Sequence, residues 1–134
     1  MTNIKQLPSA VADAQIMREH YQTTIRSANH TIYADEPAEL LGSDMGMSPS
    51  GLLLASLGSC TAITLRMYID RKMWIVEEIA VHLELFKTAE GTLITREINF
   101  RGEITEEQHQ RLIQIANSCP IHKVLTGHIE VVTS

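Results

Sequence analysis

Two cysteines, Cys60 and Cys119, are the residues of this chain with the greatest capacity for covalent chemistry. Cys119 directly precedes Pro120, where a new helix can begin, and the unpaired amides at a helix start favour a thiolate. His122 follows three residues later, at a spacing that can face the thiol. A helix-ending Cys-Pro corner beside a solvated histidine is the alternative interpretation of the same residues.

Cys60 is expected near the middle of a helix, on a face that it shares with apolar side chains. A mid-helix position gains nothing from the helix dipole, and free cysteine often behaves as a small buried hydrophobe. A reactive thiolate at Cys60 would therefore need an arginine or lysine from another segment. Helix position alone predicts that Cys119 has the lower pKa of the two thiols.

The two cysteines can also act together, because both lie on apolar faces of predicted helices and such faces pack against each other in a domain of this size. The sequence leaves the distance between them open. A zinc site with His122 and His128 ranks lower, because the Cys-x-x-Cys spacing of structural zinc is absent. A Cys-His hydrolase ranks lower still, because a mid-helix cysteine lacks the exposed turn and oxyanion donors of acyl transfer. A thiol redox pair is the favoured interpretation.

Two hairpins are predicted from alternating apolar residues and turn signals. Residues 20–35 predict two short strands around a turn at Ala28-Asn29. Residues 79–86 and 94–101 each alternate between an apolar and a polar face, and Glu90-Gly91 joins them.

Helices are predicted between and after these hairpins. Ser48-Pro49 supplies an N-cap and a first-turn proline for a helix to about residue 72, apolar nearly all round, which predicts a central buried helix. Thr105 to Gln108 forms a capping box for a second helix that ends at Cys119-Pro120. Pro120 can start a short third helix, and a last strand is predicted over residues 129–132. The expected class is α+β with mostly antiparallel strands.

Composition limits the classes of function. The 134 residues are 44% hydrophobic and 20% charged, as expected for a single domain over residues 1–134. The net charge of −5 leaves no basic surplus for phosphates, so neither nucleic acid nor an anionic membrane is an expected partner. The first twenty residues contain no apolar signal-peptide stretch, which predicts a cytoplasmic protein with reduced thiols. Residues 45–65 carry no charge, but their Gly, Pro, Ser and Thr content argues against a membrane span.

Both cysteines lie within longer recognisable motifs. HTIYADEP from His30 is followed by Met47-Ser48-Pro49 and then by LLLASLGSCTA, which contains Cys60. In the second half, Arg96-Glu97-Ile98 is followed by CPIHKVL from Cys119. These motifs resemble the osmotically inducible and organic hydroperoxide resistance proteins, the OsmC/Ohr family. The resemblance covers about residues 20–133 in the right order, and cysteine motifs on two successive helices make it specific.

The resemblance implies an intertwined α+β homodimer, with mostly antiparallel strands wrapped around two central helices and a thiol site near the subunit interface. In family members with peroxidase activity, the first cysteine attacks a hydroperoxide and the second resolves the sulfenic acid as a disulfide. Carried over, Cys60 becomes the peroxidatic residue and Cys119 the resolving residue, which reverses the ranking from helix position. The electrons would come from an external thiol, and no cofactor is expected because no metal, nucleotide or flavin motif is present.

The sequence departs from the family pattern at the start of the central helix. Well-understood members carry an acid there, just after the proline, where it orients an arginine. This chain has Ser50-Gly51 at that place. Asp35, Glu36 or Asp44 from the preceding loop could supply the carboxylate instead, and the sequence does not select among them.

The arginine that would activate Cys60 is predicted to be Arg26 or Arg18, since both lie in the N-terminal part that would wrap the partner. Arg26 is preferred because it lies on a predicted strand. A solvated surface charge is the alternative for each.

Two functions remain in competition. The first is a thiol-dependent peroxidase for organic hydroperoxides in oxidative-stress defence, in which Leu53, Leu57 and Met67 would admit a small apolar substrate. The second is a non-enzymatic dimer that senses redox state or binds a small molecule. The two cysteines favour the peroxidase and the missing acid favours the binding dimer, and the peroxidase is placed ahead.

Overall fold

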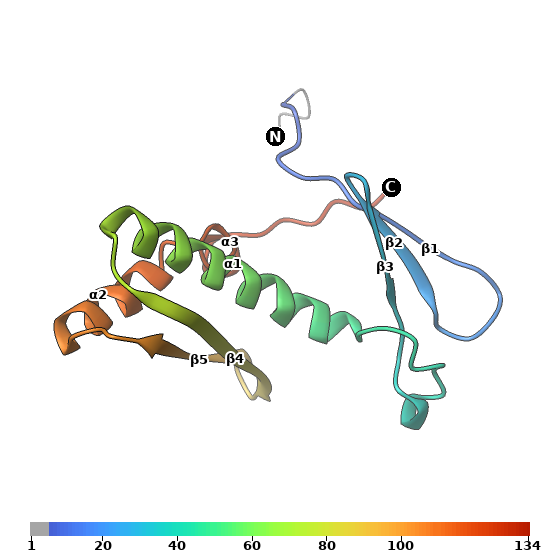
Figure 1. Cartoon of the computed structure of the whole chain (residues 1–134). Coiled ribbons are helices and arrows are strands. Elements are labelled where there is room, and N and C mark those ends of the chain that lie inside the picture. Colours follow the sequence, from blue (N-terminus) through green and yellow to red (C-terminus); the bar gives the residue numbers. More distant parts are fainter. Residues whose placement is uncertain (1–5) are drawn as a thin grey trace. The chain divides into compact units, whose positions relative to one another are not determined.

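The computed structural model describes residues 6–134, and the chain divides into two compact units at Leu52 and Leu53. The N-terminal unit contains a three-stranded sheet, and the C-terminal unit contains a helix, a long β-hairpin and two further helices (Figure 1). All the strand pairs within the two sheets are antiparallel, so the α+β class is confirmed. The single domain over residues 1–134 stays a prediction.

The N-terminal sheet has the order β1-β2-β3, formed by β1 (Asp13–Ile16), β2 (Thr23–Ser27) and β3 (His30–Ala34). The predicted hairpin is confirmed, and its turn contains Ala28 at φ 53°. Strand β1 was not predicted from the sequence, and its presence corrects that prediction. Its four residues are all exposed, and their polar–apolar alternation is too short to mark a strand by itself. Pairing with β2 defines it.

The loop between β3 and the first long helix is organised around the buried carboxylate of Asp35. Its oxygens accept hydrogen bonds from the backbone N–H groups of Glu36, Ser43 and Met45 at 2.7, 3.2 and 3.1 Å. Burial acts to raise the pKa of Asp35, but these three bonds outweigh it and hold the pKa below its ordinary value. The loop also contains a short 3₁₀ helix, η1 (Ala38–Leu40).

Helix α1 (Pro49–Lys72) begins as predicted, with the Ser48 hydroxyl accepting from the N–H of Gly51 at 3.1 Å. The prediction that it is buried all round is wrong within a single chain. Only one face is buried, because the hairpin and the following helices cover one side; that face comprises Leu57, Gly58, Thr61, Leu65 and Ile69. By length and mean hydropathy alone α1 could cross a membrane, a criterion that the core helix of a soluble protein also meets.

The second hairpin consists of β4 (Val76–Thr88) and β5 (Gly91–Gly102), each longer than predicted. Residues Thr88 and Gly91 pair at the turn. Side chains alternate between the two faces, and the inward-facing residues of β5 are Ile94, Arg96, Ile98 and Phe100.

Two helices follow the hairpin. In α2 (Glu106–Ala116), the predicted capping box is confirmed, with the Thr105 hydroxyl accepting from the N–H of Gln108 at 3.1 Å. The short helix α3 (Pro120–Thr126) starts with its proline, as predicted. The predicted strand over residues 129–132 is wrong. This segment has no neighbouring strand in the described chain to pair with, and its apolar side chains are exposed.

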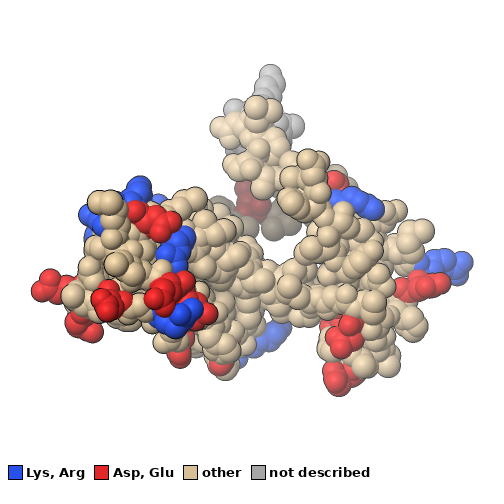
Figure 2. Space-filling model, in the orientation of Figure 1, with Lys and Arg blue, Asp and Glu red and all other residues tan. Residues whose placement is uncertain are grey.

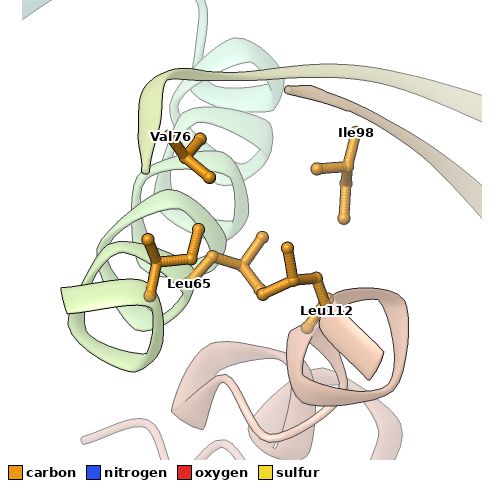
Figure 3. Close-up of a cluster of buried hydrophobic side chains, with 6 residues drawn as sticks. Leu65, Val76, Ile98 and Leu112 are labelled. Atoms are coloured by element: carbon orange, nitrogen blue, oxygen red, sulfur yellow. The ribbon is translucent and has the colours of Figure 1, made fainter. Parts of the chain in front are cut away.

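The hydrophobic core of the C-terminal unit lies where the hairpin covers the second half of α1 together with α2. Figure 3 shows Leu65 of α1 pointing toward Leu112 of α2, with Val76 and Ile98 from the hairpin beside them. Gly58 of α1 permits a close approach of the hairpin, since a Cβ atom there would lie 2.7 Å from Cδ1 of Leu83. The core therefore holds α1 and β5 in close contact beside the cysteines.

Candidate functional site

Cys60 and Cys119 lie together in the C-terminal unit. Cys60, half buried on α1, lies close enough to Cys119 for each thiol to shift the pKa of the other. Cys119 is fully buried, and neither sulfur is in a disulfide. The structure thus brings together the two cysteines that the apolar helix faces suggested could meet.

The position of Cys119 at the start of α3 determines its acidity. Burial acts to raise the pKa of Cys119, but hydrogen bonds from the Cys60 thiol and from the N–H groups of His122 and Ile121 outweigh it. The pKa of Cys119 is therefore below its ordinary value. The backbone reason is that Cys119 is the N-cap residue of α3, where the first amides have no helical partner.

The environment of Cys60 raises the pKa of its thiol. Burial raises the pKa of Cys60, and its donation to Cys119 raises it further, because the neighbouring thiolate opposes a second negative charge. Bonds from the N–H of Ile121 and the Thr64 hydroxyl lower this pKa and do not compensate. Cys119 is therefore the first of the two thiols to lose its proton and Cys60 the second. This order agrees with the ranking from helix position.

Arg96 of β5 reaches the residues on either side of the thiol pair. Its Nη1 donates to the Thr61 hydroxyl at 2.9 Å and to the Ala116 carbonyl at 3.4 Å. Its Nη2 donates to Oδ1 of Asn117 at 3.0 Å and contacts Nδ1 of His122 at 3.4 Å. Because a guanidinium can only donate, Nδ1 of His122 is the acceptor in this contact.

The buried hydroxyl of Thr61, the residue after Cys60, connects this network to α1. Its proton is donated to the Leu57 carbonyl at 2.7 Å, while its oxygen accepts from Arg96. A weaker interaction with Cys119 also lowers the pKa of that thiol. A hydroxyl has a single proton, so the Leu57 carbonyl and Cys119 compete for it.

Sequence reasoning did not select Arg96 as a site residue, although the strand period carries the signal. A two-residue alternation that contains Ile94, Ile98 and Phe100 places Arg96 on the same apolar face. A cation on the buried face of a strand needs specific partners, and this could have identified Arg96 as a candidate.

The predicted activating arginines lie in the other unit. Arg26 is exposed on β2, opposite Asp13 on one side and Thr31 on the other. Arg18 is exposed in the segment between β1 and β2. Their role toward Cys60 stays a prediction.

The candidate acids lie in the loop before α1. The carboxylate oxygens of Asp35 are occupied by three backbone N–H groups, so this side chain has an evident structural role in the loop. Asp44 is exposed at φ 55° and Glu36 is half buried. Ser50 is exposed in the first turn of α1, where the family pattern has an acid.

A cavity of about 430 Å³ opens beside Arg96. Asn117 and His122 contribute polar groups to it, and the rest of its wall is largely apolar. Of the three predicted apolar wall residues, Leu57 lines this cavity, whereas Leu53 and Met67 are exposed and do not. A cavity of this size, with an apolar wall and a few polar groups, is typical of a small-molecule site.

The family model described as OsmC-like protein matches residues 42–134, which include both cysteines and Arg96. The chain belongs to the OsmC family. No curated protein is matched by the sequence.

Solved structures of OsmC proteins have the same fold. An OsmC-like protein from Mycoplasma pneumoniae is similar at a TM-score of 0.74 and 19% identity, covering 92% of this chain and 90% of that one. An organic hydroperoxide resistance protein OsmC from Legionella pneumophila gives 0.65 and 19%, with 92% and 93% covered. An organic hydroperoxide resistance protein from Elizabethkingia anophelis gives 0.64 and 23%, with 95% and 94% covered. At these identities the likeness establishes the fold of this OsmC protein.

Proposed function

We propose that this OsmC protein is a thiol-dependent peroxidase that reduces organic hydroperoxides in oxidative-stress defence. The observation that carries the proposal is the proximity of the Cys60 and Cys119 thiols, each of which shifts the pKa of the other. Two thiols in contact can be oxidised in sequence, first to a sulfenic acid and then to a disulfide. The family and the hydroperoxide resistance proteins that share its fold support the same choice of substrate.

In the first step, Cys60 is the attacking residue because it is half buried, whereas Cys119 is fully buried. In the reacting state the pair has lost one proton, and the remaining proton is on Cys119, which leaves a thiolate on Cys60. This thiolate attacks the terminal oxygen of the hydroperoxide, an S–O bond forms, and the O–O bond breaks. The leaving alkoxide takes the proton from Cys119, so the products are Cys60 sulfenic acid, an alcohol and a Cys119 thiolate.

In the second step, the Cys119 thiolate attacks the sulfur of the Cys60 sulfenic acid. The S–S bond forms and hydroxide leaves, which balances the charge of the thiolate. The lowered pKa of Cys119 favours its thiolate form for this attack. An external thiol reductant then supplies two electrons and two protons, returning both cysteines to the reduced state while its own thiols become a disulfide.

The proposal includes a cytoplasmic, intertwined homodimer. Support comes from apolar side chains that one chain leaves exposed, including Ile63 and Met67 on α1 and Val131 near the C-terminus. Charged side chains are also sparse over α1 on the face shown in Figure 2. Exposed apolar surface of this kind is typical of a subunit interface. In the dimer, Arg26 from the wrapping N-terminal part is proposed to stabilise the Cys60 thiolate.

A non-enzymatic redox-sensing or small-molecule-binding dimer is the second candidate. The high pKa of Cys60 favours it, because a thiol that remains protonated reacts slowly with peroxide. Ser50-Gly51 in place of the acid favours it as well.

The test is consumption of tert-butyl and cumene hydroperoxide by the purified reduced protein with a dithiol reductant, beside hydrogen peroxide. The peroxidase predicts catalytic turnover of the organic hydroperoxides in preference to hydrogen peroxide. Oxidation of the thiols without turnover would support the sensor instead. Light scattering on the same sample measures the subunit number, and a monomer would contradict the dimer.

A further inference from the structure

We propose that the cavity beside Arg96 binds an amphiphilic monocarboxylate, with the carboxylate on the Arg96 guanidinium and the alkyl chain against the apolar wall. This is a binding site in its own right. It lies within the C-terminal unit and does not depend on whether the thiol pair turns over hydroperoxide.

The charge of Arg96 has no counter-ion within residues 6–134. All four of its hydrogen-bond acceptors are neutral groups: a hydroxyl, a carbonyl, a side-chain amide and an imidazole. The ion pairs among these residues involve other cations. A half-buried guanidinium that meets only neutral groups is stabilised strongly by an anion, because the surrounding dielectric is low.

The guanidinium also retains donors for an incoming anion. Two of its contacts, at 2.9 and 3.0 Å to Thr61 and Asn117, are ordinary hydrogen bonds. The two contacts at 3.4 Å, to the Ala116 carbonyl and to His122, are longer than usual, and Nε has no partner among residues 6–134. A carboxylate can bind Nε and Nη2 as a fork, in exchange for one of the two contacts that Nη2 makes, to Asn117 or to His122.

The wall of the cavity determines the rest of the ligand. Leu57, Ile94, Ile98, Ile113 and Leu125 line it, and they come from α1, β5, α2 and α3. An inorganic anion would leave this apolar wall unused, and a neutral lipid would leave the cation unpaired. The volume of about 430 Å³ lies in the lower part of the range for ligand pockets, about 300–1,000 Å³, which suits a medium-length alkyl chain.

Titration calorimetry of the reduced full-length protein with decanoate and with 1-decanol tests the site without any variant. We expect decanoate to bind at least about tenfold more tightly than the alcohol, because only the carboxylate makes a charge-assisted bond to Arg96. Neither ligand contains a peroxide, so a failure of binding and a failure of turnover are separate results. Absence of decanoate binding, or equal affinity for the two ligands, would overturn the proposal.

Variants then locate the site. Arg96→Gln is expected to weaken decanoate at least about tenfold and to leave 1-decanol unchanged, while Arg96→Lys retains part of the preference. Arg101→Gln is the matched control on the same strand, since Arg101 pairs with Glu77 at 2.7 Å outside the cavity. Circular dichroism verifies that each variant is folded. Unchanged decanoate affinity in folded Arg96→Gln would place the ligand elsewhere and contradict the assignment.

Discussion

Arg96 donates a 2.9 Å hydrogen bond to the hydroxyl of Thr61, the residue that follows Cys60 in α1. This bond joins the inward face of β5 to the helix at the height of the thiols. Because Asn117 binds the same guanidinium at 3.0 Å, the segment that leads to Cys119 is held by the same side chain. One arginine therefore connects the surroundings of both cysteines, although none of its hydrogen bonds within residues 6–134 is to a sulfur.

Replacing the cysteines separately tests their order of action. Cys60→Ser is expected to abolish hydroperoxide consumption, because the more accessible thiol is lost. Cys119→Ser is expected to retain one stoichiometric turnover, after which the sulfenic acid accumulates or is oxidised further. Mass spectrometry of each variant after one equivalent of cumene hydroperoxide measures the added oxygen.

The opposite pattern would reverse the roles. A first turnover that survives in Cys60→Ser and is lost in Cys119→Ser would identify Cys119 as the attacking residue, as its lower pKa alone suggests.

The mutual effect of the two thiols on their pKa values predicts linked titrations. In the wild type, the first proton leaves below the ordinary thiol pKa and the second above it. Cys60→Ala should raise the pKa of Cys119, because Cys119 loses a hydrogen-bond donor. Cys119→Ala should lower the pKa of Cys60, because a neighbouring negative charge is lost. The ultraviolet absorbance of the thiolates against pH measures each step, and single-variant values identical to the wild-type steps would exclude the coupling.

Activation by an arginine of the N-terminal unit has its own test. Arg26→Ala or Arg18→Ala is expected to raise the pKa of Cys60 and slow its alkylation by iodoacetamide, because a buried thiolate needs a nearby cation. Arg101→Ala is the control, since Arg101 lies in the C-terminal unit and pairs with Glu77. If the pH profile of labelling is the same in all three variants, neither predicted arginine activates Cys60.

Oxidation should produce a disulfide between Cys60 and Cys119 within one chain. The closed loop of about 60 residues would remove unfolded-state entropy worth at most about 4 kcal/mol. We expect a smaller gain in unfolding free energy, because a catalytic disulfide must remain reducible. Non-reducing mass spectrometry and denaturant curves of both forms measure the link and the gain. A link between subunits would refute the resolving role of Cys119 within its own chain.

The core beside the site should be sensitive to a single truncation. Leu112 is fully buried against Leu65, so Leu112→Ala is expected to cost about 2–5 kcal/mol of unfolding free energy. Ile113→Ala, at the adjacent and largely exposed position, is the control and should cost clearly less. Urea denaturation of both variants makes the comparison, and equal losses would contradict the assignment of the core.

Local chemistry made the helices predictable from the sequence. Ser48-Pro49 and the Thr105 capping box each combine a hydrogen-bonding cap with the residues that follow it, and the structure contains both. The β4 and β5 strands were predictable because one face of each is apolar and packs on the core. The boundaries differed because β4 begins earlier, at the core residue Val76, and because both strands continue into exposed residues near the turn.

The remaining features depend on contacts that no local pattern records. The β1 strand is defined by its pairing with β2, whereas residues 129–132 were expected to form a strand and pair with no strand within residues 6–134. The cysteines were identifiable by type and motif, and their relative pKa followed from the start of α3. The surroundings of Arg96 could not be predicted, because its four acceptors come from α1, α2, the segment after α2 and α3, all distant from Arg96 in the sequence.

The lack of a side chain at Gly58 leaves room for the hairpin beside the thiol site. Gly58 lies one turn before Thr61 on the same buried face, and Leu83, which it contacts, pairs with Arg96 across the hairpin. An added methyl group at Gly58 would meet Cδ1 of Leu83, so the Leu83 side chain would have to shift. The fit of Leu83 against Gly58 therefore holds the hairpin close to α1, one turn from the Thr61 hydroxyl that Arg96 binds.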